Sequence, residues 1–532
     1  MGLVRGHSAR AFPSKPAMLA WSLLLAWPAV ALSEDVVPPV IAPTWFDTAA
    51  FPPPTARPAL TFLPSSGAAG TSLKLDSKLL FAQGDAEHAR APDRINDSAA
   101  PAPWGQQKSY LIPALEIVGF DTLLNLFDRA YFGCCDYNSN LSSIRRNLKS
   151  SWVVDDSTFT VNQLGHPYQG SMYHGFARAS GLNYWEGLAY TFLGSAFWEI
   201  AGETTTPSKN DQISTGIGGS FLGEALFRMS NLWLEQQTGS KFWREFGAAA
   251  ISPPVGFNRL AFDKRFSAVF ESHQPEYYSR LQLGASTATQ DGPGTGEVKR
   301  HEMIANFALD YGLPGKPGYT YRRPFDYFSF ETSASSAIGF ESVMTRGLLL
   351  GTDYDVGKNY RGIWGLYGSY DYISPQIFRM ASTALSLGTT AEWRLSPSLA
   401  LQGTGLLGVG YATVSTIRNI EDETSNQYGV APQAALALRL IMGNRASLDL
   451  SAREYFVSGV SGGSRGGHDN VVRADASLTW RIYRQHALAV KYQFSHRDSD
   501  IPGLGDRERK RGTIGIFYTL LGRDRFGTAG WQ

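Results

Sequence analysis

The chain has 532 residues, which is enough for two or three domains. Lys and Arg number 48 against 47 Asp and Glu, so the net charge is +1 and the basic field that nucleic-acid binding needs is absent. Mean hydropathy is −0.19, which argues against a bundle of membrane-spanning helices. It does not argue against a membrane β-barrel, because a barrel's apolar residues alternate with polar ones.

Residues 1–33 have the features of a secretory signal peptide. Basic residues precede an apolar run from Ala17 to Trp27, and small residues follow at cleavage-site spacing. The run is too short to span a bilayer comfortably, so a cleaved leader is favoured over an uncleaved anchor. Residues 34–105 are rich in Pro and Ala and lack hydrophobic periodicity, which predicts a disordered linker.

Residues 106–265 have a helical apolar period and are predicted to form a helical domain. The clearest helices run from 183 to about 202 and from 208 to about 237. Ser208 followed by Asp211 is a capping pattern that marks the start of the second of these helices. Its next turns carry small residues at four-residue spacing, which let another helix approach closely: Thr215, Gly219 and Gly223.

The two cysteines of the chain are adjacent, at positions 134 and 135. Neighbouring cysteines cannot join distant segments, and without a second pair or a nearby His they make a poor metal site. We therefore interpret Cys134 and Cys135 as structural or incidental, and the sequence leaves their redox state open.

From about Tyr277 to Leu521 the chain alternates apolar and polar residues, with polar breaks between the runs. The segment from Val472 to Ile482 is the best example, with apolar residues on one face of a strand and charged or polar residues on the other. An apolar outer face and a polar inner face suit a closed barrel in lipid. A soluble antiparallel sandwich is the competing fold.

About twelve strands are predicted, an even number as expected of a bacterial barrel. The fold class is therefore α+β, with an N-terminal helical segment followed by an antiparallel transmembrane β-barrel over residues 266–532 of an outer-membrane protein. The expected strands are 277–285, 299–309, 325–333, 341–351, 359–371, 377–394, 398–416, 428–442, 446–458, 470–482, 486–497 and 509–521.

The stretch from Asn162 to Arg228 is dense in polar motifs. In chain order they are His166-Pro-Tyr-Gln-Gly170, Trp185-Glu186, Trp198-Glu199, Glu203, Pro207-Ser208, Asp211 and Thr215, followed by Asn258-Arg259. This order resembles the bacterial family known as domain of unknown function 3943, over about residues 106–265. The resemblance implies an envelope location and a barrel-like C-terminal part, and it supplies no established activity and no catalytic residue.

A candidate site lies within this stretch. Glu199 and Glu203 are four residues apart on one helical face, where like charges repel and favour a cation, a proton or a basic partner. We predict that Glu199 or Glu203 acts as a general base or metal ligand and that His166 shares this work. Ser195 and Asp211 are given assisting roles. Carboxylate and imidazole groups suit a divalent cation, although the sequence identifies no cofactor.

The same stretch also has a purely structural interpretation, which the sequence favours. Asp211 can be a helix cap, and Glu224 with Arg228 can form a salt bridge within one helix. Tyr168 can be a core aromatic residue. We also name Tyr168, Arg178, Glu224 and Arg228 as candidate binding residues. Within residues 162–228 the zinc-protease, serine-hydrolase elbow and phosphate-loop motifs are absent.

Three functions remain open. The first is a non-enzymatic outer-membrane barrel for transport or envelope maintenance, whose helices plug the barrel or cap it from the periplasm. The second is an envelope hydrolase or transferase acting on a lipid, glycan or ester through the His/Glu/Asp site. The third is a soluble periplasmic binding module. Expected partners are outer-membrane lipid and a small solute or lipid ligand, without nucleic acid, and the oligomeric state is open.

Overall fold

The structure, a computed structural model, describes residues 104–528 except 133–134, 156–157, 237–238, 291–298, 416–425, 460–465, 502–504 and 524. The predicted signal peptide, nearly all of the predicted linker and the side chains of Cys134 and Cys135 lie outside the described residues.

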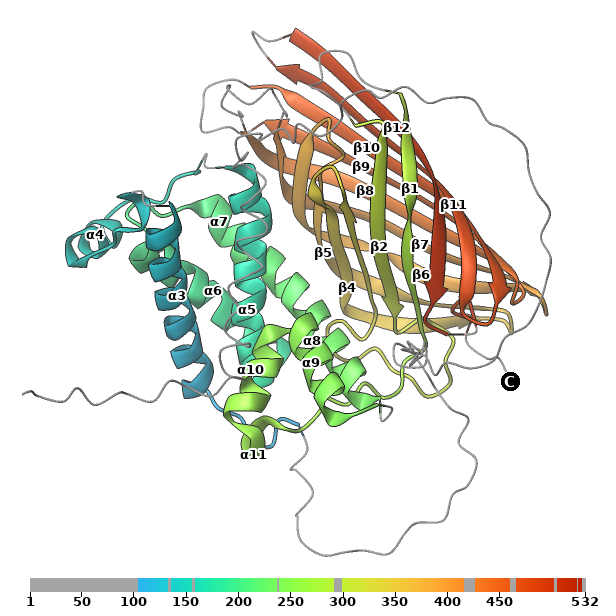
Figure 1. The fold of residues 1–532 in the computed structure, drawn as a ribbon, viewed down its shortest axis with the longest axis horizontal. Coiled ribbons are helices and arrows are strands. Elements are labelled where there is room, and N and C mark those ends of the chain that lie inside the picture. The colour runs from blue at the N-terminus through green and yellow to red at the C-terminus, as the bar shows by residue number, and fades with distance from the viewer. Residues whose placement is uncertain are drawn as a thin grey trace, which may run out of the picture.

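Helices come first in the described chain, and the strands follow (Figure 1). The helices are α3 (Leu111–Phe132), α4 (Leu141–Asn147), α5 (His166–Ala179), α6 (Tyr184–Phe197), α7 (Lys209–Ile213), α8 (Gly219–Glu235), α9 (Lys241–Ile251), α10 (Pro253–Ala261) and α11 (Asp263–Phe266), with a 3-10 turn at Cys135–Tyr137. Of the helices in the described ranges, none is both long enough and apolar enough to cross a membrane.

Three π-helical turns interrupt these helices, at Val161–Gly165, Trp198–Gly202 and Ser214–Gly218. The helix predicted from 183 to about 202 consists of α6 followed by a π turn. The helix predicted from 208 to about 237 is split into α7, a π turn and α8. A π turn adds a residue to the helical repeat and is common at functional sites. The predicted cap is confirmed, because the Ser208 hydroxyl accepts a hydrogen bond from the Asp211 backbone N–H at 3.1 Å.

Helices α5 and α8 pack closely through small residues. A Cβ atom at Gly219 would lie 2.6 Å from the Cα atom of Gly170, and one at Gly170 would lie 2.0 Å from the Thr215 carbonyl oxygen. A Cβ atom at Gly223 would lie 2.9 Å from the His174 Cβ atom. The predicted close approach of a second helix is therefore confirmed, and α5 is that helix.

Twelve antiparallel strands close into a barrel in which β1 pairs with β12. They are β1 (Tyr277–Gln290), β2 (His301–Tyr311), β3 (Phe328–Ser335), β4 (Gly339–Val356), β5 (Tyr360–Ile373), β6 (Arg379–Ser396), β7 (Leu399–Ser415), β8 (Asn426–Met442), β9 (Ala446–Gly459), β10 (His468–Tyr483), β11 (His486–Ile501) and β12 (Gly505–Leu521). The predicted fold class, with helices followed by an antiparallel twelve-strand barrel, is confirmed. The strand predicted from 325 begins at Phe328, because Asp326 instead accepts backbone N–H bonds from Arg322 and Arg323.

The outer face of the barrel is apolar. Leu387, Leu407 and Ile516 point outward and are 64%, 72% and 66% exposed. On β10 the outward-facing Trp480 is exposed whereas the inward-facing Arg473 is buried, as the alternation in the sequence predicts. An apolar exterior of this kind is what a lipid environment requires of a barrel.

Polar side chains fill the lumen. Ion pairs join strands that are not neighbours in the ring: Arg439 on β8 with Asp310 on β2 at 3.0 Å, and Arg280 on β1 with Asp449 on β9 at 3.3 Å. Tyr455 on β9 also donates to an Asp371 carboxylate oxygen on β5 at 2.9 Å. The cavity that remains among these side chains is about 130 Å³. Among the described residues, the barrel interior is therefore occupied by these polar side chains together with buried apolar ones such as Ile363 and Ile373.

The helices lie against the outer wall of the barrel, beside the ring of strands (Figure 1). On β5, Gly368, Tyr370 and Tyr372 share the outward face with exposed Trp364. A Cβ atom at Gly368 would lie 2.4 Å from the Phe221 ring on α8, and the Tyr370 hydroxyl donates to the Gln163 carbonyl at 2.5 Å. These contacts lie on the outside of the barrel and give no support to a helical plug inside the lumen, and the alternative placement, a periplasmic cap, stays a prediction.

Candidate functional site

Three of the predicted site residues converge. His166, Glu199 and Asp211 each offer one ligand-type atom, and these atoms lie within 4.8 Å of one another. The three residues are 6%, 2% and 2% exposed. One imidazole and two carboxylates at this separation can share a proton or a divalent cation.

The π turns bring these residues together. His166 begins α5 directly after the turn at Val161–Gly165, Glu199 lies inside the turn at Trp198–Gly202, and Asp211 lies in α7 just before the turn at Ser214–Gly218. The Glu199 carboxylate is held by a hydrogen bond from the Ser208 backbone N–H to Oε2 at 2.8 Å. The loop between Glu199 and α7 therefore fixes one carboxylate against the next.

The cluster and its surroundings contain more acidic than basic side chains. Burial raises the pKa of Glu199, and the nearby carboxylates of Glu203 and Asp211 raise it further. Burial also raises the pKa of Asp211, and His166 only partly offsets this. Buried carboxylates are normally compensated by cationic partners. A bound cation would supply the compensation that these two carboxyl groups lack.

Asp128 on α3 belongs to the same electrostatic neighbourhood and was missed by sequence reasoning. It is buried, and its pKa is raised to about 7 by burial and by the charge of Glu203, against the opposing effect of His166. A carboxyl group with a pKa near neutrality is suited to accept and release a proton. The available signal was the row of polar residues at helical spacing on α3, namely Asp121, Asn125 and Asp128, among apolar neighbours.

Glu203 and Ser195 do not join the three-residue cluster. The Glu203 carboxylate accepts hydrogen bonds from Trp198 Nε1 at 2.8 Å and from the Thr205 hydroxyl at 2.9 Å. Ser195 is buried on α6, and its hydroxyl forms no hydrogen bond within the described part of the chain. Glu203 thus contributes charge to the site, whereas no described contact gives Ser195 the assisting role predicted for it.

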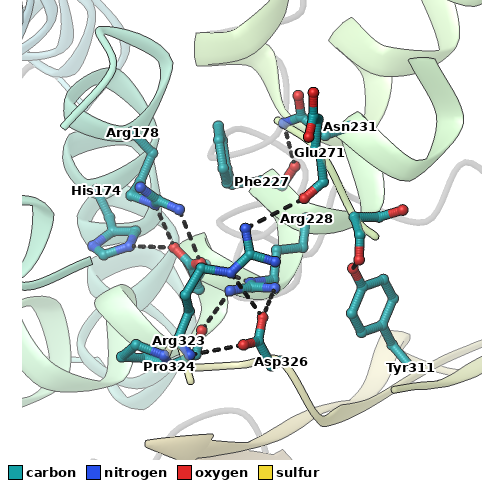
Figure 2. Close-up of polar contacts among 12 residues, drawn as sticks. His174, Arg178, Phe227, Arg228, Asn231, Glu271, Tyr311, Arg323, Pro324 and Asp326 are labelled. Carbon is teal, nitrogen blue, oxygen red and sulfur yellow. Dashed lines mark hydrogen bonds and ion pairs between the residues drawn. The ribbon is translucent and has the colours of Figure 1, made fainter. Parts of the chain in front are cut away.

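The predicted binding residues Arg178, Glu224 and Arg228 form a separate buried cluster. Glu224 accepts from Arg178 Nε at 2.7 Å and from Arg228 Nε at 2.8 Å, and it faces His174 Nε2 at 3.1 Å. Arg228 also reaches Asp326 at 3.1 Å, so the cluster joins α5 and α8 to the segment that precedes β3 (Figure 2). The predicted pairing of Glu224 with Arg228 is confirmed.

The two clusters have opposite electrostatics. Burial alone would raise the pKa of Glu224, but Arg178, His174 and Arg228 together lower it well below the ordinary value of a glutamate. Glu224 is therefore a compensated structural anion, whereas the charges that most affect the pKa of the buried Glu199 are carboxylates, although the His166 imidazole lies close to it. The fourth predicted binding residue, Tyr168, lies in the apolar core around α3 and α5.

The donor set fits a divalent cation. Imidazole nitrogen and carboxylate oxygen are ligands that Zn²⁺ and other first-row divalent ions accept, and three protein ligands are typical of a site that keeps a position for water. His166, Glu199 and Asp211 would hold the ion, and the surrounding negative charge would favour it.

Solved barrels resemble the C-terminal part only distantly. The NanC porin aligns at 9% identity over 45% of this chain and 98% of its own, with a TM-score of 0.23. The outer membrane channel DcaP of Acinetobacter baumannii aligns at 8% identity over 46% of this chain and 96% of its own, with a TM-score of 0.21. Scores this low carry no argument, so the barrel assignment rests on the strand pairing itself.

No curated protein matches the chain. Residues 151–254 match the family model described as "Domain of unknown function (DUF3943)". This span contains all of the motifs named above up to Thr215 and is narrower than the 106–265 expected from them. The predicted resemblance is thereby confirmed for residues 151–254, the segment that carries His166, Glu199 and Asp211 and that matches this family model.

Proposed function

We propose that this chain is an outer-membrane β-barrel protein whose helical domain holds a divalent cation on His166, Glu199 and Asp211 and hydrolyses an ester bond of a membrane lipid. The observation that carries the proposal is the convergence of these three buried side chains within 4.8 Å, in surroundings whose charge is mostly negative.

The barrel supports the outer-membrane location. Its outward-facing side chains form an apolar surface, as a bilayer requires. At one end, tight turns join β4 to β5, β6 to β7, β8 to β9 and β10 to β11, and β2 to β3 is the exception with a longer connection. At the other end, longer connections join β1 to β2, β7 to β8 and β9 to β10, and shorter ones join β3 to β4, β5 to β6 and β11 to β12. Short turns are typical of the periplasmic end and longer loops of the external end.

The helical domain supports a lipid substrate. Helix α3 exposes large apolar side chains on one face, at helical spacing: Leu111, Leu115, Val118 and Leu126. An amphipathic helix with such a face favours contact with acyl chains. The domain also covers part of the barrel wall that would otherwise contact lipid. A substrate drawn from the membrane would therefore reach this domain without crossing the barrel.

The chemistry follows from the residues at the cluster. A bound divalent cation supplies a Lewis acid and makes a coordinated water more acidic. His166, Glu199 and Asp211 would hold this cation, and the Ser208 backbone N–H keeps Glu199 in place. Asp128, with a pKa of about 7, is the group suited to accept the proton of the attacking water and return it to the leaving alcohol.

A second candidate is favoured by the depth of burial. Because His166, Glu199 and Asp211 are almost fully buried, the cation would serve as a structural tie between α5, the turn after α6 and α7. The chain would then be a non-enzymatic envelope protein that maintains the membrane. A transport role has less support, because side chains bridge the lumen from strand to strand.

The test begins with metal content. The full-length protein, purified in detergent after equilibration with Mg²⁺, Mn²⁺, Ca²⁺ or Zn²⁺, should retain about one equivalent of one of these ions by mass spectrometry of the elements. His166→Ala and Asp211→Asn should lose it, whereas Glu245→Gln, on the partly exposed α9, should keep it. Wild-type protein that retains none of these ions refutes both candidates.

The second step separates the two candidates. Asp128→Asn should keep the cation, since Asp128 is not one of the three converging residues, but it should abolish the change in envelope lipids that expression of the wild-type protein causes. The same lipid profile with Asp128→Asn as with wild type would exclude the enzyme and leave the structural cation. Loss of the lipid change with the cation retained supports the hydrolase.

A further inference from the structure

A large apolar cavity lies between the helical domain and the outer wall of the barrel. Its volume is about 430 Å³, within the range of ligand-binding pockets. Helix α8 lines it with Leu222, Leu226, Met229 and Trp233, which recur at helical spacing and so occupy one face of that helix.

The opposite wall of the cavity is the lipid-facing surface of the barrel. Phe307 on β2, Phe330 on β3 and Val343 on β4 share their strand faces with outward-pointing residues such as exposed Met303. In a barrel without helices beside it, these side chains would contact acyl chains of the bilayer. The helical domain thus packs directly onto β5 through Phe221 but leaves a pocket over the membrane-facing side of β2–β4.

Such a space is unusual for a protein interior. Interiors are close-packed, with few voids larger than a water molecule. Apolar cavities lack the polar partners that water needs, so they stay dry and take up apolar molecules instead. Few of the lining residues carry a polar group: Tyr168, Trp233, Gln236, Tyr277 and Thr332.

The cavity also has a direction. On the helical side, the lining runs along α8 from Leu222, near its start, to Gln236, just past its end. Glu235 accepts a hydrogen bond from the Ser272 backbone N–H at 2.6 Å, so the end of α8 lies beside the segment that leads into β1 at Tyr277. On the barrel side, Tyr277 pairs with Tyr311, whereas Val343 pairs with Thr332 and so lies level with Phe307, farther along β2. The first residue of β1 lies at the barrel end that carries the tight turns, which is the end expected to face the periplasm. A lipid from the periplasmic leaflet would thus have its polar part near Gln236 and its chain end near Leu222.

We propose that this cavity binds one acyl chain of a glycerophospholipid from the periplasmic leaflet of the outer membrane. The inference goes beyond the proposed function, because it concerns binding at a second place rather than hydrolysis at the His166 cluster. Enclosing the chain between α8 and β2–β4 replaces contacts that the barrel wall would otherwise make with bulk lipid.

The first experiment uses the wild-type full-length chain in vesicles of phosphatidylethanolamine that carries a photoactivatable diazirine near the end of one acyl chain. Peptide mapping after illumination is expected to find the label on α8 around Leu222 and Leu226. A diazirine close to the ester group is expected to label the region of Gln236 and Tyr277 instead. Labelling confined to the exposed barrel belt, such as Leu436 on β8, would overturn the proposal.

A filling variant with a matched control completes the test. Leu226→Trp narrows the cavity and should lose most of the α8 labelling, whereas Leu436→Trp places the same bulk on an exposed outward site and should leave it unchanged. Equal α8 labelling in both variants would contradict the proposal. If Leu226→Trp does not fold, the proposal is still tested by the wild-type chain, through the comparison of labelling by the two diazirine positions.

The chemical source of the chain is read from the purified protein. Extraction and mass spectrometry should recover phospholipid, and recovery of lipopolysaccharide, free fatty acid or detergent alone would overturn the stated occupant. The readout is independent of the cation, so Glu199→Gln should keep the α8 label. A metal-free protein that still binds the label refutes the proposed function alone, and an unlabelled protein that holds the cation refutes this inference alone.

Discussion

Two buried glutamates of the helical domain offer a matched perturbation. Glu224 is surrounded by Arg178, Arg228 and His174, and Glu199 by carboxylates. Replacing each with Gln removes one negative charge at nearly constant volume. The account predicts opposite signs: Glu224→Gln destabilises the protein, and Glu199→Gln stabilises it when no divalent cation is present.

The expected magnitudes follow from the two environments. Breaking a buried ion pair by removing one partner costs about 3–5 kcal/mol, which for a domain of this size lowers Tm by on the order of 10 °C. The pKa of Glu199 is raised on folding, so its ionised form is disfavoured in the folded state. The stability it contributes is present below the ordinary glutamate pKa and is lost as pH rises toward the raised value. Glu199→Gln has no ionisable group at this position, so it does not lose stability in this way as pH rises.

The assay is thermal unfolding of both variants and the wild type at about pH 8, with a chelator and then with the bound cation restored. With chelator, Glu199→Gln should unfold at or above the wild-type Tm, and Glu224→Gln well below it. The cation should raise the Tm of the wild type and of Glu224→Gln but not that of Glu199→Gln. If Glu199→Gln is as destabilised in chelator as Glu224→Gln, Glu199 has a protein counter-charge and the reasoning fails.

Three further predictions concern pH, packing and the lumen. Folding raises the pKa of Asp128 to about 7, so the chelated protein should lose up to about 4 kcal/mol of stability as pH rises from about 4 to about 7. In urea titrations, Asp128→Asn should not show this loss of stability. The same pH profile in the variant and the wild type would contradict the prediction. Gly219→Ala should destabilise the helical domain by about 1–3 kcal/mol in the same titrations, because its Cβ would meet Gly170, whereas Gly119→Ala, with open space on α3, should be neutral or stabilising. In planar bilayers the wild-type barrel should show no steady conductance, and regular channel openings would contradict the filled lumen.

The sequence predicted the barrel well because its signal is local. Alternation with period two depends only on neighbouring residues, so all twelve strands were placed to within a few residues of their observed bounds. The helix cap at Ser208 and the pairing of Glu224 with Arg228 are also local, within one turn of helix, and both were predicted.

The arrangement of the helices was not predictable in the same way. Whether Phe221 packs inside or outside the barrel depends on which face of the strands it contacts. The sequence of a strand, with small and aromatic residues such as Gly368 and Tyr370, does not show which helix packs against that face. The site was predicted in part: His166, Glu199 and Asp211 do converge. Asp128 was missed because it comes from α3, an element far away in the chain, and the π turns carry no recognised sequence signature.

Binding of a divalent cation by His166, Glu199 and Asp211 can be observed by anomalous diffraction. Crystals of the full-length protein grown with Mn²⁺ or Zn²⁺ should show an anomalous difference peak between the His166 imidazole and the two carboxylates, at ligand distances of about 2.0–2.2 Å. A Glu199→Gln crystal grown in the same way should lose the peak. Ordered density for all three side chains with no peak between them in the wild-type crystal would contradict the account.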